Sequence, residues 1–212
     1  MDIIKSLIRL ENLAEKINSP EAHALKRKLF QEAVTAVCNE EELLPLKEKK
    51  VALIEWGESP QFANKIEADR LSLNDPDLFE KVKAYSSLIV ALSQCSTVLP
   101  DCGIGEKEKF LFYTLSKCGI PTVAVIFGTP YALSNLPLFE AMVVAYENQN
   151  EAQEAAADVL LGQLSPKGRL PVSVGPHFPV GAGLNYKEIQ GSLLNAAMNQ
   201  LGDSFYSRVL TF

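Results

Sequence analysis

Four short runs of almost entirely apolar residues constrain the fold of this chain more than any other feature. Runs of this length without alternation are typical of strands that are covered on both faces of a sheet. Stretches with helical periodicity separate them, and strands that alternate with helices predict a parallel, doubly wound sheet with right-handed crossovers. We therefore expect an α/β protein, a three-layer αβα sandwich with a mostly parallel sheet. The four runs are residues 51–54, 87–92, 122–127 and 141–145, and the helical stretches between them are 61–67, 76–85 and 106–118. A weaker pattern at Leu71 and Leu73 predicts one further short strand.

The two ends of the chain have a different pattern from the middle. Residues 2–17 have apolar positions at helical spacing, and Ser19-Pro20 predicts the start of a second helix, with a capping hydroxyl and proline at the first helical position. The second helix is expected to run through Val37 and to end at Asn39. Residues 187–212 contain one more helical pattern, at 189–201. The predicted division is a helical linker at 1–46, an α/β sandwich domain at 47–186, and a helical tail, or the start of another domain, at 187–212.

Composition excludes several classes of function. The chain has 212 residues, a net charge of −6 and 47% hydrophobic residues, which suits one domain with a sizeable core. Phosphate binding relies on clustered Lys and Arg, so an acidic body argues against nucleic acid. No apolar run approaches the roughly 18 residues that a membrane-spanning helix needs. The N-terminus shows no basic region followed by an apolar one, so no signal peptide is recognised and the compartment stays open.

The sequence offers little to a metal or a cofactor. The four cysteines have no Cys-x-x-Cys spacing and only two histidines are present, so we expect free thiols and no metal site. Gly103-Ile104-Gly105 lacks the third glycine of a dinucleotide fingerprint and lies too far from the preceding strand. No Gly-x-Ser-x-Gly nucleophile elbow occurs. The expectation is therefore a protein without a cofactor.

Paired carboxylates are natural candidates for general acid and base catalysis. Glu147 is the most interesting of them, because it follows the run 141–145 and should lie at the carboxyl edge of the sheet, where ligands of open parallel sheets bind. A carboxylate without a visible partner more often has a structural role, so Glu147 could also simply hydrogen-bond to nearby loop amides. Trp56 follows the first run and can offer a stacking surface to a sugar, or simply pack at the rim. Glu147 and Trp56 are the candidate substrate-binding residues. The other carboxylates considered are Asp101, Glu106, Glu108 and Glu140.

The region from residue 151 to 186 is the most distinctive. Alanines on one side of a helix at 151–160 predict close packing on the sheet, and Gly162 suits the left-handed position that stops a helix. Residues 165–168 have turn chemistry, and a short strand is expected at Arg169-Leu170, with Pro171 at its end or on an edge. The motifs in order are Ala157-Asp158-Val159-Leu160-Leu161-Gly162, Pro166-Lys167-Gly168-Arg169-Leu170-Pro171 and Gly181-Ala182-Gly183-Leu184-Asn185-Tyr186.

These motifs resemble the signature of the C-terminal α/β domain of family 3 glycoside hydrolases. Leu43-Leu44-Pro45-Leu46, after a helix that begins at Ser19-Pro20, is similar to the linker that introduces this domain. The stretches 126–133 and 145–147 are similar to the N-acetylglucosaminidase-like branch of the family.

The resemblance implies a partner domain that carries the catalytic residues. Family 3 enzymes carry their catalytic aspartate on an N-terminal TIM barrel, which we do not find in these 212 residues. The β-glucosidase branch draws a glutamate from the second domain, near a Glu-Gly-x-Asp-Arg motif, and residues 101–108 do not match it. No catalytic residue is therefore assigned. The expected function is an accessory domain that supports the active-site rim of an O-glycosyl hydrolase, inactive alone, with the TIM barrel and a carbohydrate as partners. The alternative is a non-enzymatic carbohydrate-binding or assembly module on the same fold.

Overall fold

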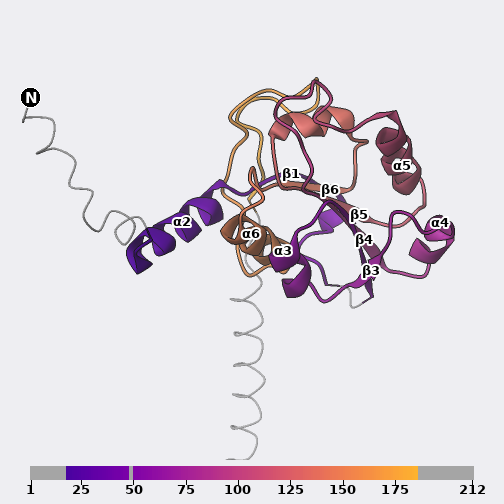
Figure 1. Ribbon diagram of the computed structural model, residues 1–212, viewed down its shortest axis with the longest axis horizontal. Coiled ribbons are helices and arrows are strands. Elements are labelled where there is room, and N and C mark those ends of the chain that lie inside the picture. The colour runs from indigo at the N-terminus through magenta and orange to yellow at the C-terminus, as the bar shows by residue number, and fades with distance from the viewer. Residues whose placement is uncertain (1–17, 48–49, 186–212) are drawn as a thin grey trace, which may run out of the picture.

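The computed structural model describes residues 18–47 and 50–185. One six-stranded sheet lies between two helical layers, and α2 extends to one side of this body (Figure 1). The helices predicted at 2–17 and 189–201 lie outside the described residues. The strands are β1 (Thr35–Asn39), β2 (Val51–Trp56), β3 (Asp69–Leu71), β4 (Ser87–Leu92), β5 (Thr122–Ile126) and β6 (Ala141–Val144). The helices are α2 (Pro20–Ala33), α3 (Pro60–Lys65), α4 (Leu78–Val82), α5 (Glu106–Ser116) and α6 (Asn150–Leu160), with 3-10 turns η1 (Glu40–Glu42) and η2 (Pro130–Asn135).

The order of the strands in the sheet is β1-β6-β5-β4-β2-β3. Strands β2 to β6 run parallel to one another. Strand β1 alone is antiparallel, on the edge of the sheet beside β6. The predicted α/β sandwich with a mostly parallel sheet is confirmed. All four apolar runs form strands, and the weaker pattern at Leu71 marks the end of β3.

Two hydrophobic cores fill the space on the two faces of the sheet. Side chains alternate between the faces along a strand. Leu53 of β2 therefore packs with α3 and α6, while Ile54 packs with α4 and α5. Every residue of β4 and β5 is buried, which explains why these runs show no polar alternation.

The second helix is shorter than the sequence pattern predicted. It begins as expected, with Ser19 accepting a hydrogen bond from Ala22 N at 3.2 Å and Pro20 at the first position. It ends at Ala33, and the expectation of helix through Val37 was wrong: Thr35–Asn39 form β1, paired with β6. Pairing along the exposed side of β6 buries Val34 and Ala36 completely. The free energy gained by this burial and strand pairing outweighs the local preference for helix, as tertiary contacts commonly override helix propensity.

Helix α6 packs as its alanines predicted. Its buried residues include Ala152, Ala155 and Ala156, whose small side chains let the helix lie close to the sheet. Gly162 follows it with a φ of 70°, the left-handed conformation expected at a helix end. Among these small residues lies one long polar side chain, Gln153, only 2% exposed. Its Oε1 accepts hydrogen bonds from Gln61 N at 2.9 Å and Phe62 N at 3.2 Å, so it caps the start of α3.

Candidate functional site

The carboxyl ends of four parallel strands meet at one edge of the sheet, which we call the carboxyl edge. It is formed by the residues that follow β2, β4, β5 and β6, namely 57–59, 93–105, 127–129 and 145–149. Ligands of open α/β sheets bind outside this kind of edge. Glu147 lies in this edge, and Trp56, the last residue of β2, lies directly before it.

Two glycines let the loops of the carboxyl edge approach one another closely. A Cβ on Gly57, which has a φ of 98°, would lie 2.3 Å from Ser93 Oγ and 2.7 Å from Gln94 Cγ. A Cβ on Gly128 would lie 2.8 Å from Cys95 Cβ. Each position therefore requires glycine, at Gly57 for conformation as well as space. The sequence analysis assigned no role to either glycine, because the residues that crowd them come from other loops.

Trp56 lies at the end of β2, beside a hollow of about 270 Å³. Its ring packs edge-on against Phe112 of α5, with ring centroids 6.3 Å apart, which fixes the orientation of the indole. Four polar side chains surround the hollow: Asn74, Gln94, Lys107 and Glu108. An aromatic side chain ringed by amide, ammonium and carboxylate groups can offer both an apolar surface and hydrogen bonds to a polyhydroxylated ligand.

Glu147 is exposed and lies apart from this hollow, which it does not line. Among the described residues no hydrogen bond or ion pair holds its carboxylate. The loop that carries it is firmly placed: Asn148 Nδ2 donates to Glu58 O at 3.0 Å, and Gln153 Nε2 donates to Asn148 Oδ1 at 2.7 Å. The loops after β2 and β6 are thus joined, but only Trp56 of the two predicted residues lines the hollow.

Tyr146, directly before Glu147, has a strained backbone. Its φ of 68° is unusual for a residue with a bulky side chain. Its hydroxyl lies 2.7 Å from Thr35 Oγ1, at the junction of α2 and β1. Burial raises the pKa of Tyr146, and the hydrogen bond with Thr35 offsets part of that rise. Strained residues persist where the surrounding structure holds them, and they concentrate at functional sites.

The remaining candidate carboxylates have structural roles. Asp101 Oδ1 accepts a hydrogen bond from Gly103 N at 2.9 Å, as in a tight turn. Glu106 pairs with Lys109 at 2.9 Å. Glu140 Oε2 accepts from Thr122 N at 2.9 Å at the opposite end of the sheet. These contacts bring no two of these carboxylates together as an acid and base pair.

The thiols of this region are not activated. All four cysteines are free. Burial, with a smaller contribution from Cys102, raises the pKa of Cys95 at the carboxyl edge to about 12, so its thiol is protonated at neutral pH and is a poor nucleophile. No group of three or more His, Cys, Asp or Glu in the described part of the chain is arranged to hold a metal ion. None of the described helices is long and apolar enough to span a membrane.

The segment 168–184 packs against the junction of α2 and β1. A Cβ on Gly168 would lie 2.0 Å from Ala33 O, and one on Gly183 would lie 2.4 Å from Gly168 O. The strand expected at Arg169-Leu170 does not form. The segment instead makes two isolated bridges, Val174 with Phe178 and Leu184 with Ala36. Gly168 and Gly183 therefore let three stretches of backbone pack closely: the end of α2, the turn at Gly168 and the turn at Gly183.

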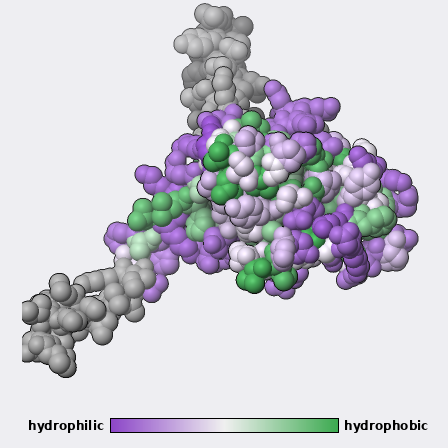
Figure 2. All heavy atoms as spheres, turned by 90° about the horizontal axis from the view of Figure 1, so that it is seen from above, coloured by the Kyte–Doolittle hydropathy of each residue, from purple (hydrophilic) through white to green (hydrophobic). Residues whose placement is uncertain are grey.

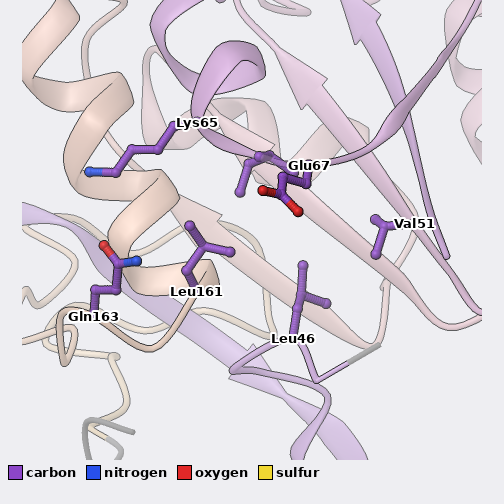
Figure 3. A pocket seen from close by; sticks show the side chains of 7 residues that line it. Leu46, Val51, Lys65, Glu67, Leu161 and Gln163 are labelled. Carbon is purple, nitrogen blue, oxygen red and sulfur yellow. The ribbon is translucent and has the colours of Figure 1, made fainter. Parts of the chain in front are cut away.

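A larger hollow, of about 540 Å³, lies at the opposite, amino edge of the sheet. Figure 3 shows the carboxylate of Glu67 facing into it, with Leu46 and Val51 across the space. Lys65, which also lines the hollow, forms an ion pair with Asp158 of α6. This hollow lies at the other end of the strands from the loops of the carboxyl edge.

The fold and its edge define an αβα sandwich domain whose loops gather at the carboxyl ends of parallel strands. Residues 95–186 match the family model of the glycosyl hydrolase family 3 C-terminal domain. The resemblance seen in the sequence motifs is thus confirmed: this part of the chain matches the family 3 C-terminal domain, and the chain is homologous to glycosidases. The matched region contains only β5 and β6 of the six strands, and the structure adds that β1 to β4 belong to the same sheet.

Individual relatives agree with this assignment. A probable beta-glucosidase I from Aspergillus terreus is 32% identical over 96 residues, which cover 42% of this chain and 11% of that protein. Among solved structures, a fungal multi-domain family 3 beta-N-acetylglucosaminidase has a TM-score of 0.63 at 20% identity, over 76% of this chain and 20% of that one. A family 3 beta-N-acetylglucosaminidase from Paenibacillus has a TM-score of 0.57 at 16% identity, over 78% of this chain and 34% of that one. The chain therefore spans a minor part of each relative, and the solved structures support the fold alone.

Proposed function

We propose that this chain is the accessory C-terminal domain of a β-N-acetylglucosaminidase-like family 3 glycosidase, an enzyme that hydrolyses O-glycosyl bonds. The observation that carries the proposal is the match of residues 95–186 to the family 3 C-terminal domain. In family 3 enzymes such a domain pairs with an N-terminal catalytic domain. Its partner here would be a TIM barrel, and the carboxyl edge would complete the rim of the barrel's active site.

The chemistry of the carboxyl edge supports an accessory role. Retaining and inverting glycosidases need two carboxyl groups on either side of the scissile bond. Glu108 lines the hollow beside Trp56, whereas Glu147 does not. Among the described residues Glu108 is the one carboxylate that lines this hollow, so the hollow can orient a sugar but does not supply an acid and base pair by itself.

Exposed apolar residues near this edge suit a partner domain. Val98 and Leu99, in the loop after β4, are 87% and 54% exposed, and Tyr131 of η2 is 52% exposed. Leu25 and Leu29 of α2 are exposed as well. Figure 2 shows apolar residues at the surface of the arm that carries α2. These exposed apolar side chains support contact with a partner domain.

The proposed ligand of the hollow is a sugar, held through Trp56. Trp56 is the only tryptophan of the chain, so its fluorescence reports on this hollow alone. Titration with N-acetylglucosamine and, separately, with glucose should change that emission, and Asn74→Ala should weaken the response. Glu147→Gln tests whether the second predicted binding residue contributes. A flat response to both sugars up to on the order of 100 mM would contradict a sugar site at Trp56.

The alternative, a non-enzymatic carbohydrate-binding or assembly module, makes a different prediction. Such a module would bind sugar with full affinity alone, whereas a rim domain should bind better when a family 3 barrel is supplied. The chain alone should not turn over an aryl N-acetylglucosaminide or an aryl glucoside. Turnover by the purified chain that survives Glu147→Gln and Glu108→Gln would point to a contaminant, whereas turnover lost in either variant would overturn the accessory role.

A further inference from the structure

Helix α5 carries a stripe of exposed side chains that the domain itself does not cover. Glu106, Phe110, Tyr113 and Lys117 are spaced by four, three and four residues. With about 100° of rotation per residue, they lie within about 60° of one another on one side of the helix. Phe110 is 70% exposed and Tyr113 is 56% exposed. The buried side of α5, with Phe112 and Leu115, packs on the sheet.

The two aromatic side chains are costly to leave in water. Burying a phenylalanine side chain is worth roughly 1.5–3 kcal/mol, so the exposed ring of Phe110 is a source of unused binding energy. A hollow of about 380 Å³ lies beside Tyr113, lined by Lys109 and residues 134–137. Leu138, the next residue along the chain, is 54% exposed and extends the apolar surface. The surface thus offers both a projecting ring and a space beside it.

The order of the side chains along the stripe is self-complementary. Glu106 and Lys117 lie at its two ends, equally far from its middle, and Phe110 and Tyr113 flank that middle symmetrically. A two-fold axis through the middle, with the helices antiparallel, places Phe110 of each copy against Tyr113 of the other. The same axis places Glu106 of each copy against Lys117 of the other. A two-fold dimer requires this relation, in which the same patch serves both partners.

The charges of the stripe favour the antiparallel arrangement. Glu106 is bonded to Lys109 Nζ at 2.9 Å and is still 91% exposed, so its carboxylate can accept a second cation. Lys117 Nζ lies 5.5 Å from the centre of the Tyr113 ring, close to where a partner would bring its acid. Parallel helices would place Glu106 against Glu106 and Lys117 against Lys117, and like charges in an interface are unfavourable.

We propose that the exposed stripe of α5 is a homodimerisation surface, occupied by the same stripe of a second copy of this chain. Phe110 of one copy enters the hollow beside Tyr113 of the other, and two Glu106–Lys117 pairs close the ends. The interface is distinct from the carboxyl edge and does not depend on the function proposed for that edge. One helix pair and a short loop form a contact at the small end of specific interfaces, so the expected Kd is on the order of 10–100 µM.

Sedimentation velocity of the full chain over a concentration series tests the surface. The wild type should convert from monomer to dimer with rising concentration, and Phe110→Glu should weaken the dimer by at least about thirtyfold. Val98→Glu changes a more exposed apolar residue on the carboxyl edge and should leave the Kd unchanged. A wild type that stays monomeric to on the order of 1 mM overturns the proposal, as does a dimer that Phe110→Glu leaves intact.

Charge exchange tests the register without relying on loss of function. Glu106→Lys and Lys117→Glu should each weaken self-association by about tenfold, because each converts two attractive pairs into repulsive ones. A mixture of the two variants should form a heterodimer in which both pairs are attractive again. The double variant should also recover dimerisation. Failure of both recoveries, with each variant folded by circular dichroism, overturns the antiparallel register and with it the proposal.

Discussion

Helices α6 and α5 are of equal length and cover opposite faces of the same sheet, but they differ in how much of each is buried. Seven residues of α6 are buried, most of them alanines. In α5 only Phe112 and Leu115 are buried, and large aromatic residues face outward. Helix α6 packs against α2 and α3 as well as the sheet, which leaves no room for larger side chains on it. Helix α5 is covered on one side only, and its outer side is free to meet a partner.

The difference shows which part of the molecule specifies the fold and which part is available for binding. Around α6, small residues and glycines hold backbones together, as at Gly168, and a polar side chain is acceptable only when it is fully bonded, as at Gln153. Around α5 and the carboxyl edge, large side chains project into solvent instead. Substitutions of similar size should therefore have large effects on the first region and small effects on the second.

The largest effect is expected at Gly168, where the signature segment meets the end of α2. Gly168→Ala places a Cβ 2.0 Å from Ala33 O and 2.3 Å from Thr35 Oγ1, so backbone must move. We expect a loss of more than about 3 kcal/mol in the free energy of unfolding, measured by urea denaturation. The matched control is Gly105→Ala at the start of α5, where the nearest atom is the flexible Glu108 Oε2 at 3.0 Å. It should cost about 1 kcal/mol or less. Equal costs at the two glycines would contradict the contrast between the two sides.

Gln153 should have the next largest effect. Gln153→Met keeps the length of the side chain but removes the acceptor that holds Gln61 N and Phe62 N. Leaving buried donors unsatisfied costs about 1–3 kcal/mol, and α3 should exchange its first amide protons faster. Gln149→Met, at the exposed start of α6, removes only a 3.3 Å bond from Lys26 and should change stability by less than about 0.5 kcal/mol. Unchanged exchange at Gln61 and Phe62 would show that Gln153 does not cap α3.

The sequence predicted most of the elements because each has a local signal. The apolar runs predicted four strands, and Ser19-Pro20 and Gly162 predicted a helix start and a helix stop. Strand β1 was mistaken for helix because its partner, β6, is about a hundred residues away and gives no local signal. The strand expected at Arg169-Leu170 does not form, and the backbone partners of this segment are equally distant in sequence: Gly168 N donates to Val34 O and Leu184 N donates to Ala36 O.

The candidate site was predictable only in part. A residue after a parallel strand lies at the carboxyl edge by topology, so Trp56 and Glu147 were placed there from sequence. The tight approach at Gly57, the strain at Tyr146 and the cap made by Gln153 depend on which loops meet in space. That Trp56 lines the hollow and Glu147 does not follows from the same tertiary geometry. The spacing of residues along the chain does not predict this difference.

Tyr146 should have a moderate effect that depends on pH. Tyr146→Phe removes the 2.7 Å contact with Thr35 Oγ1, at an expected cost of about 0.5–1.5 kcal/mol at pH 7. The pKa of Tyr146 is raised in the folded state. The unfolded state therefore loses its proton first, and the stability that Tyr146 contributes is present below about pH 10 and is lost as the pH rises above it. The difference between wild type and Tyr146→Phe in urea denaturation should shrink above pH 10. A difference that grows there would contradict the assigned direction.

Phe110→Ala on α5 should have the smallest effect on the fold, and it separates folding from assembly. Because the ring is 70% exposed, its removal should change the stability of the monomer by less than about 0.5 kcal/mol, measured in dilute solution below the dimerisation range. Phe112→Ala, two residues away on the buried side, should cost about 3–5 kcal/mol. At concentrations where the chain dimerises, Phe110→Ala should lower the melting temperature relative to wild type, since a dimer stabilises the folded state by mass action. An equal effect in dilute and concentrated solution would show that Phe110 does not contribute to assembly and would remove the contrast between α5 and α6.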